Sequence, residues 1–352
     1  MAECITVREP GNTVIQDLGR YRAARVGQMT GGALDRYSAE VANALVASDS
    51  SAPLLELLAA DFAAVASTDL LIAVTGAPAD VRADGLPCPR WEPFVWRAGT
   101  ELTVRGIRDG LRVYLAVHGA IAAERLLGSC APDSVLGFGH RLTAGSDIAV
   151  EVDGPTADHP HFRLPVLRFG ARPAPFPAEW TIDVTDGPDA AEFADTGRRL
   201  FESPFVVGVD SNHIGLRLTP VDPAQPLPRR MARGEVLSRG VPIGAVEVPA
   251  GDQLLVLHRG RGVTAGYPVL AVVTAVGLSR LGQVRPGQRV LFRHVTIADA
   301  VRRYRAQQAA IERLRTRVAA AFAELRIPVH ITPPTSGPPS GPANPQNHLE
   351  YP

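Results

Sequence analysis

The chain has 352 residues, of which 45% are hydrophobic and 20% charged, and its 36 basic residues balance 36 acidic ones. At about 150 residues per domain this length predicts two domains, and the balanced charge gives no overall field that would attract nucleic acid or an anionic membrane. The sequence contains no lysine, which excludes a lysine-dependent phosphate loop, a Schiff-base enzyme, and a domain that carries biotin or lipoate.

Cysteine usage and the start of the chain bear on its location. Cys4, Cys88 and Cys130 are odd in number and show no CxxC spacing, which argues against a disulfide framework or a structural zinc site and favours a reducing compartment. The first residues are acidic where a signal peptide is basic, and apolar runs are interrupted by charges such as Glu56 and Asp61. We therefore expect a cytoplasmic protein without membrane contact.

Two short helices are predicted within a mostly β chain. Asp35 or Ser38 can cap a helix whose apolar residues follow at four-residue spacing as far as Leu45. A second helix is expected after a Gly-Pro pair, with Phe193 and Leu200 on its apolar side. Both are expected to cover a sheet face or the mouth of a barrel.

Four segments share a pattern of a tight turn followed by a strand: 97–104, 143–150, 249–256 and 285–292. In each, Ala or Pro followed by Gly suits the centre of a type II turn, and the branched apolar residues that follow suit a half-buried strand. Two copies lie in each half of the chain. The spacing is too irregular for a solenoid, so the pattern predicts two mainly β units.

The boundary between the units is marked by composition. Residues 154–179 carry six prolines and no sustained hydrophobic period, which is typical of a connector. The sequence therefore predicts an N-terminal β unit over 1–153 and a C-terminal β unit over 180–295.

A long helix is predicted over 296–327. Thr296 and Asp299 begin it like a capping box, and an apolar stripe follows. The opposite face is rich in arginine, which indicates a solvated face, or alternatively a face that docks a partner or nucleic acid. The tail, 328–352, is too rich in Pro, Gly and Ser to bury a core and is predicted to be disordered.

Few residues indicate a metal site or a catalytic site by themselves. His159 and His161 are two apart without a cysteine or acid at ligand spacing, so no metal site is predicted. Ser211 and His213 lack the GxSxG elbow of a hydrolase. Sequence chemistry alone thus indicates a two-unit β protein with glycine-rich loops.

A family resemblance carries the analysis further. About a dozen short motifs keep their order over residues 5–295, and together they are specific although each is loose. The main motifs lie at 11–20, 31–35, 74–77, 114–119, 187–188, 246–249, 264–268 and 283–287. They resemble the KipA family, whose members are also known as C-type subunits of 5-oxoprolinase or as allophanate hydrolase subunit 2. The family is similar to part of the carboxyltransferase region of urea carboxylase.

The resemblance implies a mainly β fold of two cyclophilin-like β-barrel units with a few helices. It also implies a complex with a KipI-like (B-type) protein and a LamB/YcsF-like (A-type) protein, which opens the lactam of 5-oxoproline to glutamate with ATP. No cofactor is expected on this chain itself. ATP, and biotin in the carboxyltransferase branch, would be handled by partner subunits.

Two alternatives stay open beside this hydrolase function. The other branch of the family moves a carboxyl group from carboxybiotin to urea or a related amide, and the absence of lysine is compatible with it because the biotinyl-lysine belongs to another domain. The third possibility is a non-catalytic protein that binds or antagonises a KipI-like partner.

The sequence departs from the family pattern at several polar positions. Asn212 and His213 replace an acid and an arginine, Glu247 replaces a glutamine, and 259–264 contains glycines where the family has Asp and Gln. A change from Gln to Glu removes two hydrogen-bond donors and adds charge, so either the substrate differs or activity has decayed.

The candidate site residues follow from these motifs. Asp35 could instead be a helix cap, Glu56 a satisfied buried acid, and Gly266 a turn residue. The predicted catalytic residues are Ser211, His213 and Glu247, and the predicted residues for binding a small amide substrate are Asp35, Arg217, Thr264, Gly266 and Tyr267.

Overall fold

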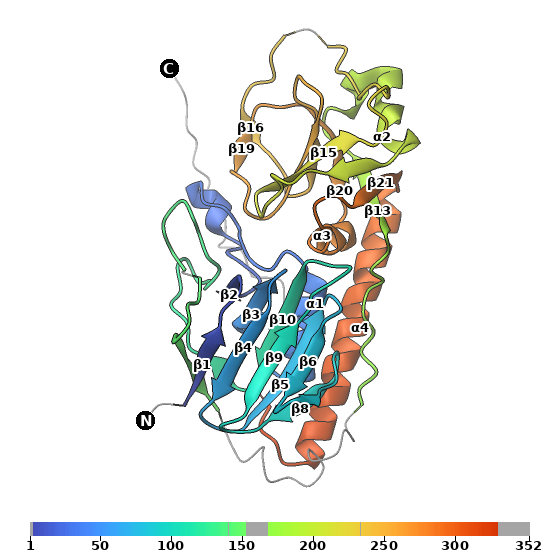
Figure 1. The fold of residues 1–352 in the computed structure, drawn as a ribbon. Coiled ribbons are helices and arrows are strands. Elements are labelled where there is room, and N and C mark those ends of the chain that lie inside the picture. The colour runs from blue at the N-terminus through green and yellow to red at the C-terminus, as the bar shows by residue number, and fades with distance from the viewer. Residues whose placement is uncertain (1–2, 140, 153–167, 233, 330–352) are drawn as a thin grey trace, which may run out of the picture.

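The computed structural model describes residues 3–139, 141–152, 168–232 and 234–329. It confirms the predicted mainly β fold with two units, a few helices and a long C-terminal helix. In Figure 1 the N-terminal unit lies below the C-terminal unit, and α4 runs beside both. Within the described residues, no helix combines the length and apolarity needed to cross a membrane.

The N-terminal unit consists of two antiparallel sheets with a shared apolar core. The seven-stranded sheet has the order β11 (Ala120–Ile121), β12 (Asp147–Glu151), β1 (Cys4–Glu9), β4 (Phe62–Ala66), β9 (Glu101–Arg105), β6 (Asp80–Ala83) and β7 (Leu86–Pro87). The five-stranded sheet has the order β2 (Thr13–Gln16), β3 (Leu54–Leu58), β10 (Arg112–Val117), β5 (Leu70–Gly76) and β8 (Pro93–Trp96).

The C-terminal unit is a closed barrel with its own core. One parallel pair, between β13 and β21, joins its otherwise antiparallel strands. Around the barrel the order is β13 (Glu179–Asp186), β20 (Val269–Val273), β17 (Ala245–Glu247), β18 (Leu254–Leu257), β15 (Gly215–Pro220), β14 (Phe205–Val207) and β21 (Arg289–His294). A separate two-stranded sheet pairs β16 (Arg239–Gly240) with β19 (Thr264–Ala265).

All four predicted turn-and-strand segments are present. Gly99, Gly145 and Gly287 have φ values of 75°, 84° and 85°, and the strands β9, β12 and β21 follow them. Gly251 precedes β18. The left-handed turn conformation explains why glycine stands at these positions.

The helices cover faces of the two units. They are η1 (Ala23–Val26), α1 (Arg36–Leu45), η3 (Ala190–Arg198), α2 (Arg199–Glu202), α3 (Ala275–Leu281) and α4 (Ile297–Glu324). Helix α1 packs on β5 and β10 of the five-stranded sheet, and η3 and α2 contact the barrel strands β20 and β21. Both short predicted helices are thereby confirmed.

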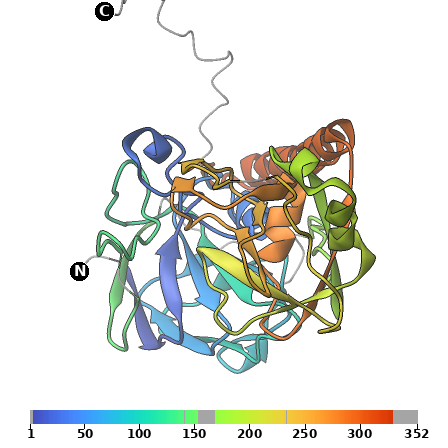
Figure 2. The ribbon, with the colours of Figure 1, turned by 90° about the horizontal axis from the view of Figure 1, so that it is seen from above.

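Helix α4 follows the barrel in sequence but packs mainly on the N-terminal unit. Its predicted N-cap is confirmed, since the Thr296 hydroxyl accepts a hydrogen bond from the Asp299 N–H at 3.1 Å. The buried stripe contains Ile311, Val318 and Phe322, which join α1 and the outer face of the five-stranded sheet in one core. Figure 2 looks down on the barrel and shows α4 at one edge of the molecule. The last helix therefore completes the first unit.

The arginine-rich face of α4 is mostly solvated, as predicted, with two exceptions. Arg303 pairs with Asp183 of β13, which ties the start of the helix to the barrel. Arg315 is buried and donates a hydrogen bond to the Ser48 carbonyl at 3.0 Å. The helix thus contacts both units through polar groups as well as apolar ones.

Part of the predicted connector and tail lies outside the described residues. The described end of the connector, 168–178, contains no helix or strand and leads into β13. Residues 153–167, which include His159 and His161, and the tail residues 330–352 are outside the description.

A glutamine side chain joins the two units. Gln283 follows α3, and its Oε1 accepts hydrogen bonds from the backbone N–H groups of Leu111 and Arg112 at 3.0 and 2.9 Å. Its Nε2 donates to Asp35 Oδ2 at 2.7 Å and to the Arg112 carbonyl at 3.1 Å. Four hydrogen bonds therefore converge on one buried amide, and all four partners belong to the N-terminal unit.

Neighbouring residues extend this joint. The Arg112 guanidinium donates to the Gly282 carbonyl, and Arg285 donates to the carbonyls of Ile107 and Gly110 at 3.0 and 2.9 Å. A Cβ added at Gly282 would lie 2.6 Å from the Leu34 carbonyl carbon, so the backbones approach as closely as glycine permits. The motif at 283–287 is thus the contact surface between the units.

We predict that Gln283→Ala lowers the free energy of unfolding by about 3 kcal/mol, because it leaves buried backbone N–H groups and the Asp35 carboxyl without a partner. Equilibrium urea unfolding measures the change. Gln307→Ala, on α4, is the matched control and should stay within about 0.5 kcal/mol of the wild type. Equal effects of the two substitutions would contradict the role of Gln283 as the joint.

Candidate functional site

Polar side chains of both units meet above the outer face of the five-stranded sheet. Glu56 on β3 and Arg112 and Tyr114 on β10 lie on this face, because the alternate residues of both strands point into the core. Arg112 Nε lies 3.4 Å from Glu56 Oε1, and both side chains are buried. Glu56 Oε2 accepts no hydrogen bond from the described residues. A buried ion pair with one free carboxylate oxygen thus forms the floor of the site.

His213 of the C-terminal unit is exposed and lies within electrostatic range of this ion pair. It lies between β14 and β15, and its carbonyl accepts a hydrogen bond from the Gly260 N–H at 2.9 Å. Partial burial and the charge of Arg112 lower the pKa of the His213 ring, while the carboxylates of Glu56 and Asp133 act in the opposite direction. The ring is therefore neutral at pH 7 and able to accept a proton.

His258 lies behind His213 and has a structural role. Its Nδ1 accepts the Arg259 N–H at 2.9 Å, so Nε2 carries the proton and donates to the Leu278 carbonyl at 3.1 Å. Complete burial, together with the charges of Arg259 and Arg112, lowers the pKa of His258 to about 3. This neutral imidazole fixes the backbone at the start of 259–264, where the sequence departs from the family pattern.

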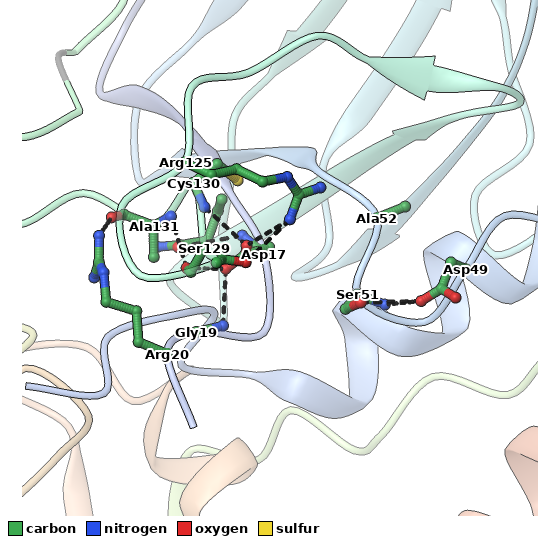
Figure 3. Close-up of polar contacts among 12 residues, drawn as sticks. Asp17, Gly19, Arg20, Asp49, Ser51, Ala52, Arg125, Ser129, Cys130 and Ala131 are labelled. Atoms are coloured by element: carbon green, nitrogen blue, oxygen red, sulfur yellow. Dashed lines mark hydrogen bonds and ion pairs between the residues drawn. The ribbon is translucent and has the colours of Figure 1, made fainter. Parts of the chain in front are cut away.

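The loop of the N-terminal unit that carries Asp133, which is within electrostatic range of His213, is held by Asp17. Asp17 Oδ1 accepts hydrogen bonds from the Gly19 N–H at 2.8 Å and the Ser129 hydroxyl at 2.6 Å, and Oδ2 accepts the Cys130 N–H at 2.9 Å. Figure 3 shows these groups converging on Asp17, with Arg125 on the far side at 3.9 Å. Both Asp17 and Ser129 are buried, so Ser129 serves as a loop anchor.

Arg20 fixes the same loop from its other side. Its Nε donates to the Leu126 carbonyl at 3.0 Å, and Nη2 donates to the carbonyl of Ala131, as Figure 3 also shows. Asp133 follows in the loop, is fully buried, and accepts a hydrogen bond from Gln28. The carboxylate that acts on His213 is therefore held in a rigid setting.

Glu247 lies on the outside of the barrel wall. Its neighbour Val246 points into the barrel core, while Glu247 is 1% exposed and packs on the opposite face with Oε1 unpartnered among the described residues. Burial raises the pKa of this carboxyl to about 7. Thr264 and Ala265 form β19, which pairs with β16, and the Val248 N–H donates to the Pro268 carbonyl at 3.0 Å. Glu247 thus lies next to the 264–268 motif.

The predicted site residues fall into three places. Ser211 and Arg217 lie on one hairpin with His213, and the Ser211 hydroxyl accepts the Arg217 N–H at 3.0 Å; no hydrogen bond joins Ser211 to His213 among the described contacts. Thr264, Gly266 and Tyr267 lie beside Glu247, with Thr264 and Tyr267 exposed.

Asp35 lies at the joint between the units. It caps α1 by accepting the Ser38 N–H at 3.1 Å, and it accepts the Gln283 amide. Burial raises the pKa of its carboxyl. The residue also lines a cavity of about 330 Å³ with Tyr37 and Trp180. The helix-cap role is therefore present, and a substrate role would have to operate through this cavity.

Sequence reasoning missed Arg112 as a member of the site. A single charged residue within an apolar strand, such as Arg112 at the start of β10, is a signal that was available. Among the described residues, no group of three or more His, Cys, Asp or Glu side chains could hold a metal ion. What the arrangement offers is proton transfer at a neutral imidazole beside a buried carboxylate.

Comparison with known proteins gives a consistent result. The carboxyltransferase domain family, subdomains A and B, matches residues 26–294. The C-type subunit of 5-oxoprolinase from Escherichia coli (strain K12) is 31% identical over 319 residues, which cover 87% of this chain and 96% of that protein. Urea amidolyase of Lachancea kluyveri is 27% identical over 332 residues, but these cover only 18% of that protein.

A solved structure agrees with the fold. The crystal structure of TTHA0988 is 32% identical and superposes with a TM-score of 0.72 over 83% of this chain. This chain spans 55% of the length of TTHA0988, about half. The two-unit arrangement is therefore shared with a considerably longer chain.

The raised pKa of the Glu247 carboxyl predicts that the free energy of unfolding depends on pH. Its pKa of about 7 in the folded state lies above its ordinary value of 4.5, so the stabilisation by the protonated form is complete below pH 4.5 and is lost as the pH rises through about 7. We expect Glu247→Gln to be about 2 kcal/mol more stable than the wild type at alkaline pH, and similar to it under acidic conditions.

Urea unfolding across this pH range measures the effect. The matched control is the exposed Glu235→Gln, which should follow the wild-type curve. A parallel pH dependence in wild type and Glu247→Gln would show that Glu247 is not the titrating group.

Proposed function

The chain belongs to the carboxyltransferase domain family, and we propose that within it the chain is the C-type component of an ATP-dependent 5-oxoprolinase. The observation that carries this proposal is the match to the C-type subunit of 5-oxoprolinase over 96% of the length of that protein. The relative and this chain thus correspond almost from end to end. The much longer urea amidolyase corresponds over a small fraction only.

Opening a lactam breaks the ring C–N bond and adds the elements of water. The carbonyl carbon takes the hydroxyl group, and the ring nitrogen takes a proton to become the amine of glutamate. A neutral His213 can accept the proton from the attacking water and return it to the nitrogen. The buried Glu56–Arg112 pair lies within electrostatic range of this imidazole and helps to set its proton affinity.

The free energy of ATP hydrolysis drives this otherwise unfavourable step. The chain has neither a lysine nor a GxxxxGK[ST] loop, so we assign ATP, and biotin where it is used, to partner chains. A KipI-like (B-type) protein and a LamB/YcsF-like (A-type) protein are the proposed partners. Three cysteines without disulfides support a reducing compartment such as the cytoplasm.

Reconstitution tests the function. The chain, purified with KipI-like and LamB/YcsF-like proteins from the same organism, should release glutamate from 5-oxoproline only when ATP is present. Well-formed complexes without release would overturn the hydrolase proposal and favour a binding role.

His213 is the residue to test within that complex. His213→Gln should lower kcat about 100-fold, since general-base catalysis contributes two or more orders of magnitude, whereas the neighbouring Asn212→Ala should stay within about twofold of the wild type. Because the His213 pKa is lowered, activity should persist below pH 6.5 and fall only as the imidazole protonates. Full activity of His213→Gln would remove the imidazole from the mechanism.

Carboxyl transfer from carboxybiotin to urea or a related amide is the second candidate. It is favoured by the family description and by the 27% identity to urea amidolyase. The same reconstituted chain, supplied with a biotin carboxylase, a biotinylated carrier protein, ATP and bicarbonate, would then show ATP consumption that depends on urea and is blocked by avidin. Avidin-insensitive glutamate release from 5-oxoproline would exclude it.

A further inference from the structure

The backbone at His213 is paired with the segment 258–260. The antiparallel pairing of β15 and β18 continues beyond the ends of both strands, through two further backbone hydrogen bonds. The His258 N–H donates to the Ile214 carbonyl at 2.7 Å, and the Gly260 N–H donates to the His213 carbonyl at 2.9 Å. Gly260 is buried. The residue that carries the imidazole therefore lies directly beside Gly260.

The segment 258–260 is held on its other sides as well. The His258 ring accepts the Arg259 N–H and donates to the Leu278 carbonyl, and this ring is fully buried. The Arg259 carbonyl accepts a hydrogen bond from the Gly31 N–H of the N-terminal unit at 2.9 Å. A shift of this segment would therefore break hydrogen bonds within the barrel and between the units.

Gly260 leaves no room for a side chain. A Cβ added there would overlap His213 Cδ2 and would lie 2.9 Å from the His213 carbonyl oxygen, whereas carbon atoms of neighbouring groups pack at about 3.5–4.0 Å. The φ of Gly260 lies outside the left-handed region, so other residues could adopt this backbone. The space taken by the His213 ring, and not the backbone conformation, is what requires glycine at this position.

The His213 ring has few other restraints. Among the described residues, neither of its ring nitrogens makes a hydrogen bond, and the residue is exposed. One edge of the ring lies against Gly260, as the overlap with an added Cβ shows. Packing on this glycine therefore decides whether the ring stays on the barrel or turns about its Cα–Cβ bond into solvent.

The position of the ring matters because several titratable groups act on it. Partial burial and the charge of Arg112 on β10 favour the neutral imidazole, and the carboxylates of Glu56 on β3 and Asp133 oppose them. His258 is also within electrostatic range. Burial and charge act over short distances, so a ring that turned away would experience less of each.

We propose that Gly260 positions the His213 imidazole: the missing side chain at 260 lets the ring rest on the barrel backbone within range of the Glu56–Arg112 pair. The proposal deepens the proposed function, on which its catalytic consequence rests. Gly260 itself acts only through His213. Gly262 provides a comparison in the same loop, since a Cβ there would have its nearest neighbour, the Thr264 carbonyl oxygen, at an ordinary 3.6 Å.

An NMR titration of the histidine ring protons in the isolated chain tests the positioning. The His213 signal is identified as the one that His213→Gln removes. In Gly260→Ala the His213 pKa should rise toward its ordinary value of 6.5, because the displaced ring loses the partial burial that lowers it. Gly262→Ala is the matched control and should leave the His213 pKa unchanged.

The reconstituted complex tests the catalytic consequence. Gly260→Ala should lower kcat at least about tenfold, since small displacements of a catalytic group are costly, and the acid limb of the pH profile should move to higher pH together with the His213 pKa. Gly262→Ala should stay within about twofold of the wild type. The titration needs neither partners nor substrate, so an inactive wild-type complex would overturn the proposed function while the titration still decides the role of Gly260.

A double variant separates positioning from damage to the fold. Gly260→Ala should lower the urea midpoint less in a His213→Ala background than in the wild type, because the ring that it displaces is then absent. Should Gly260→Ala alone not fold, the double variant should still fold. An unchanged His213 pKa in Gly260→Ala, an equal rise in Gly262→Ala, or an equal loss of stability in both backgrounds would overturn the proposal, as would a double variant that does not fold.

Discussion

The arrangement of the molecule depends on one buried amide. The Gln283 amide accepts hydrogen bonds from the backbone N–H groups of Leu111 and Arg112, at the start of β10, and donates one to the Arg112 carbonyl. It also donates a hydrogen bond to the Asp35 carboxyl, which caps α1. Donors and acceptors are matched, so the amide tolerates only one relative position of the units. Glu56 and Arg112 lie within electrostatic range of His213 because of that position. The geometry of the site thus depends on the joint as much as on either unit.

The fold was largely predictable because its signals are local. Gly99, Gly145 and Gly287 take the left-handed turn conformation that the pattern requires, and the caps at Asp35 and Thr296 use side chains three residues from their partners. A period or a cap can be recognised within a short window of sequence. Strands β9, β12, β18 and β21 and the helices α1, η3 and α4 followed from such windows, whereas α3 and the other strands did not.

The site was less predictable because its contacts are long-range. Gln283 and Arg112 are 171 residues apart, and no local pattern links them. Glu56 was recognised as a candidate, but its partner Arg112 was not, since a single arginine in a strand indicates burial without indicating a partner. The predicted group of Ser211, His213 and Glu247 separated into two places for the same reason: Glu247 lies on strand β17, whereas Ser211 and His213 lie between β14 and β15.

Helix α4 has a consequence for the order in which the chain can fold as it is synthesised. Ile311, Val318 and Phe322 complete the apolar layer over α1 and the five-stranded sheet. The ribosome produces this layer last, after the whole barrel. The N-terminal unit therefore emerges with an uncovered apolar face and must either wait in a partly folded state or be shielded by a chaperone until the helix arrives. The segment that is synthesised last thus packs onto the unit that is synthesised first.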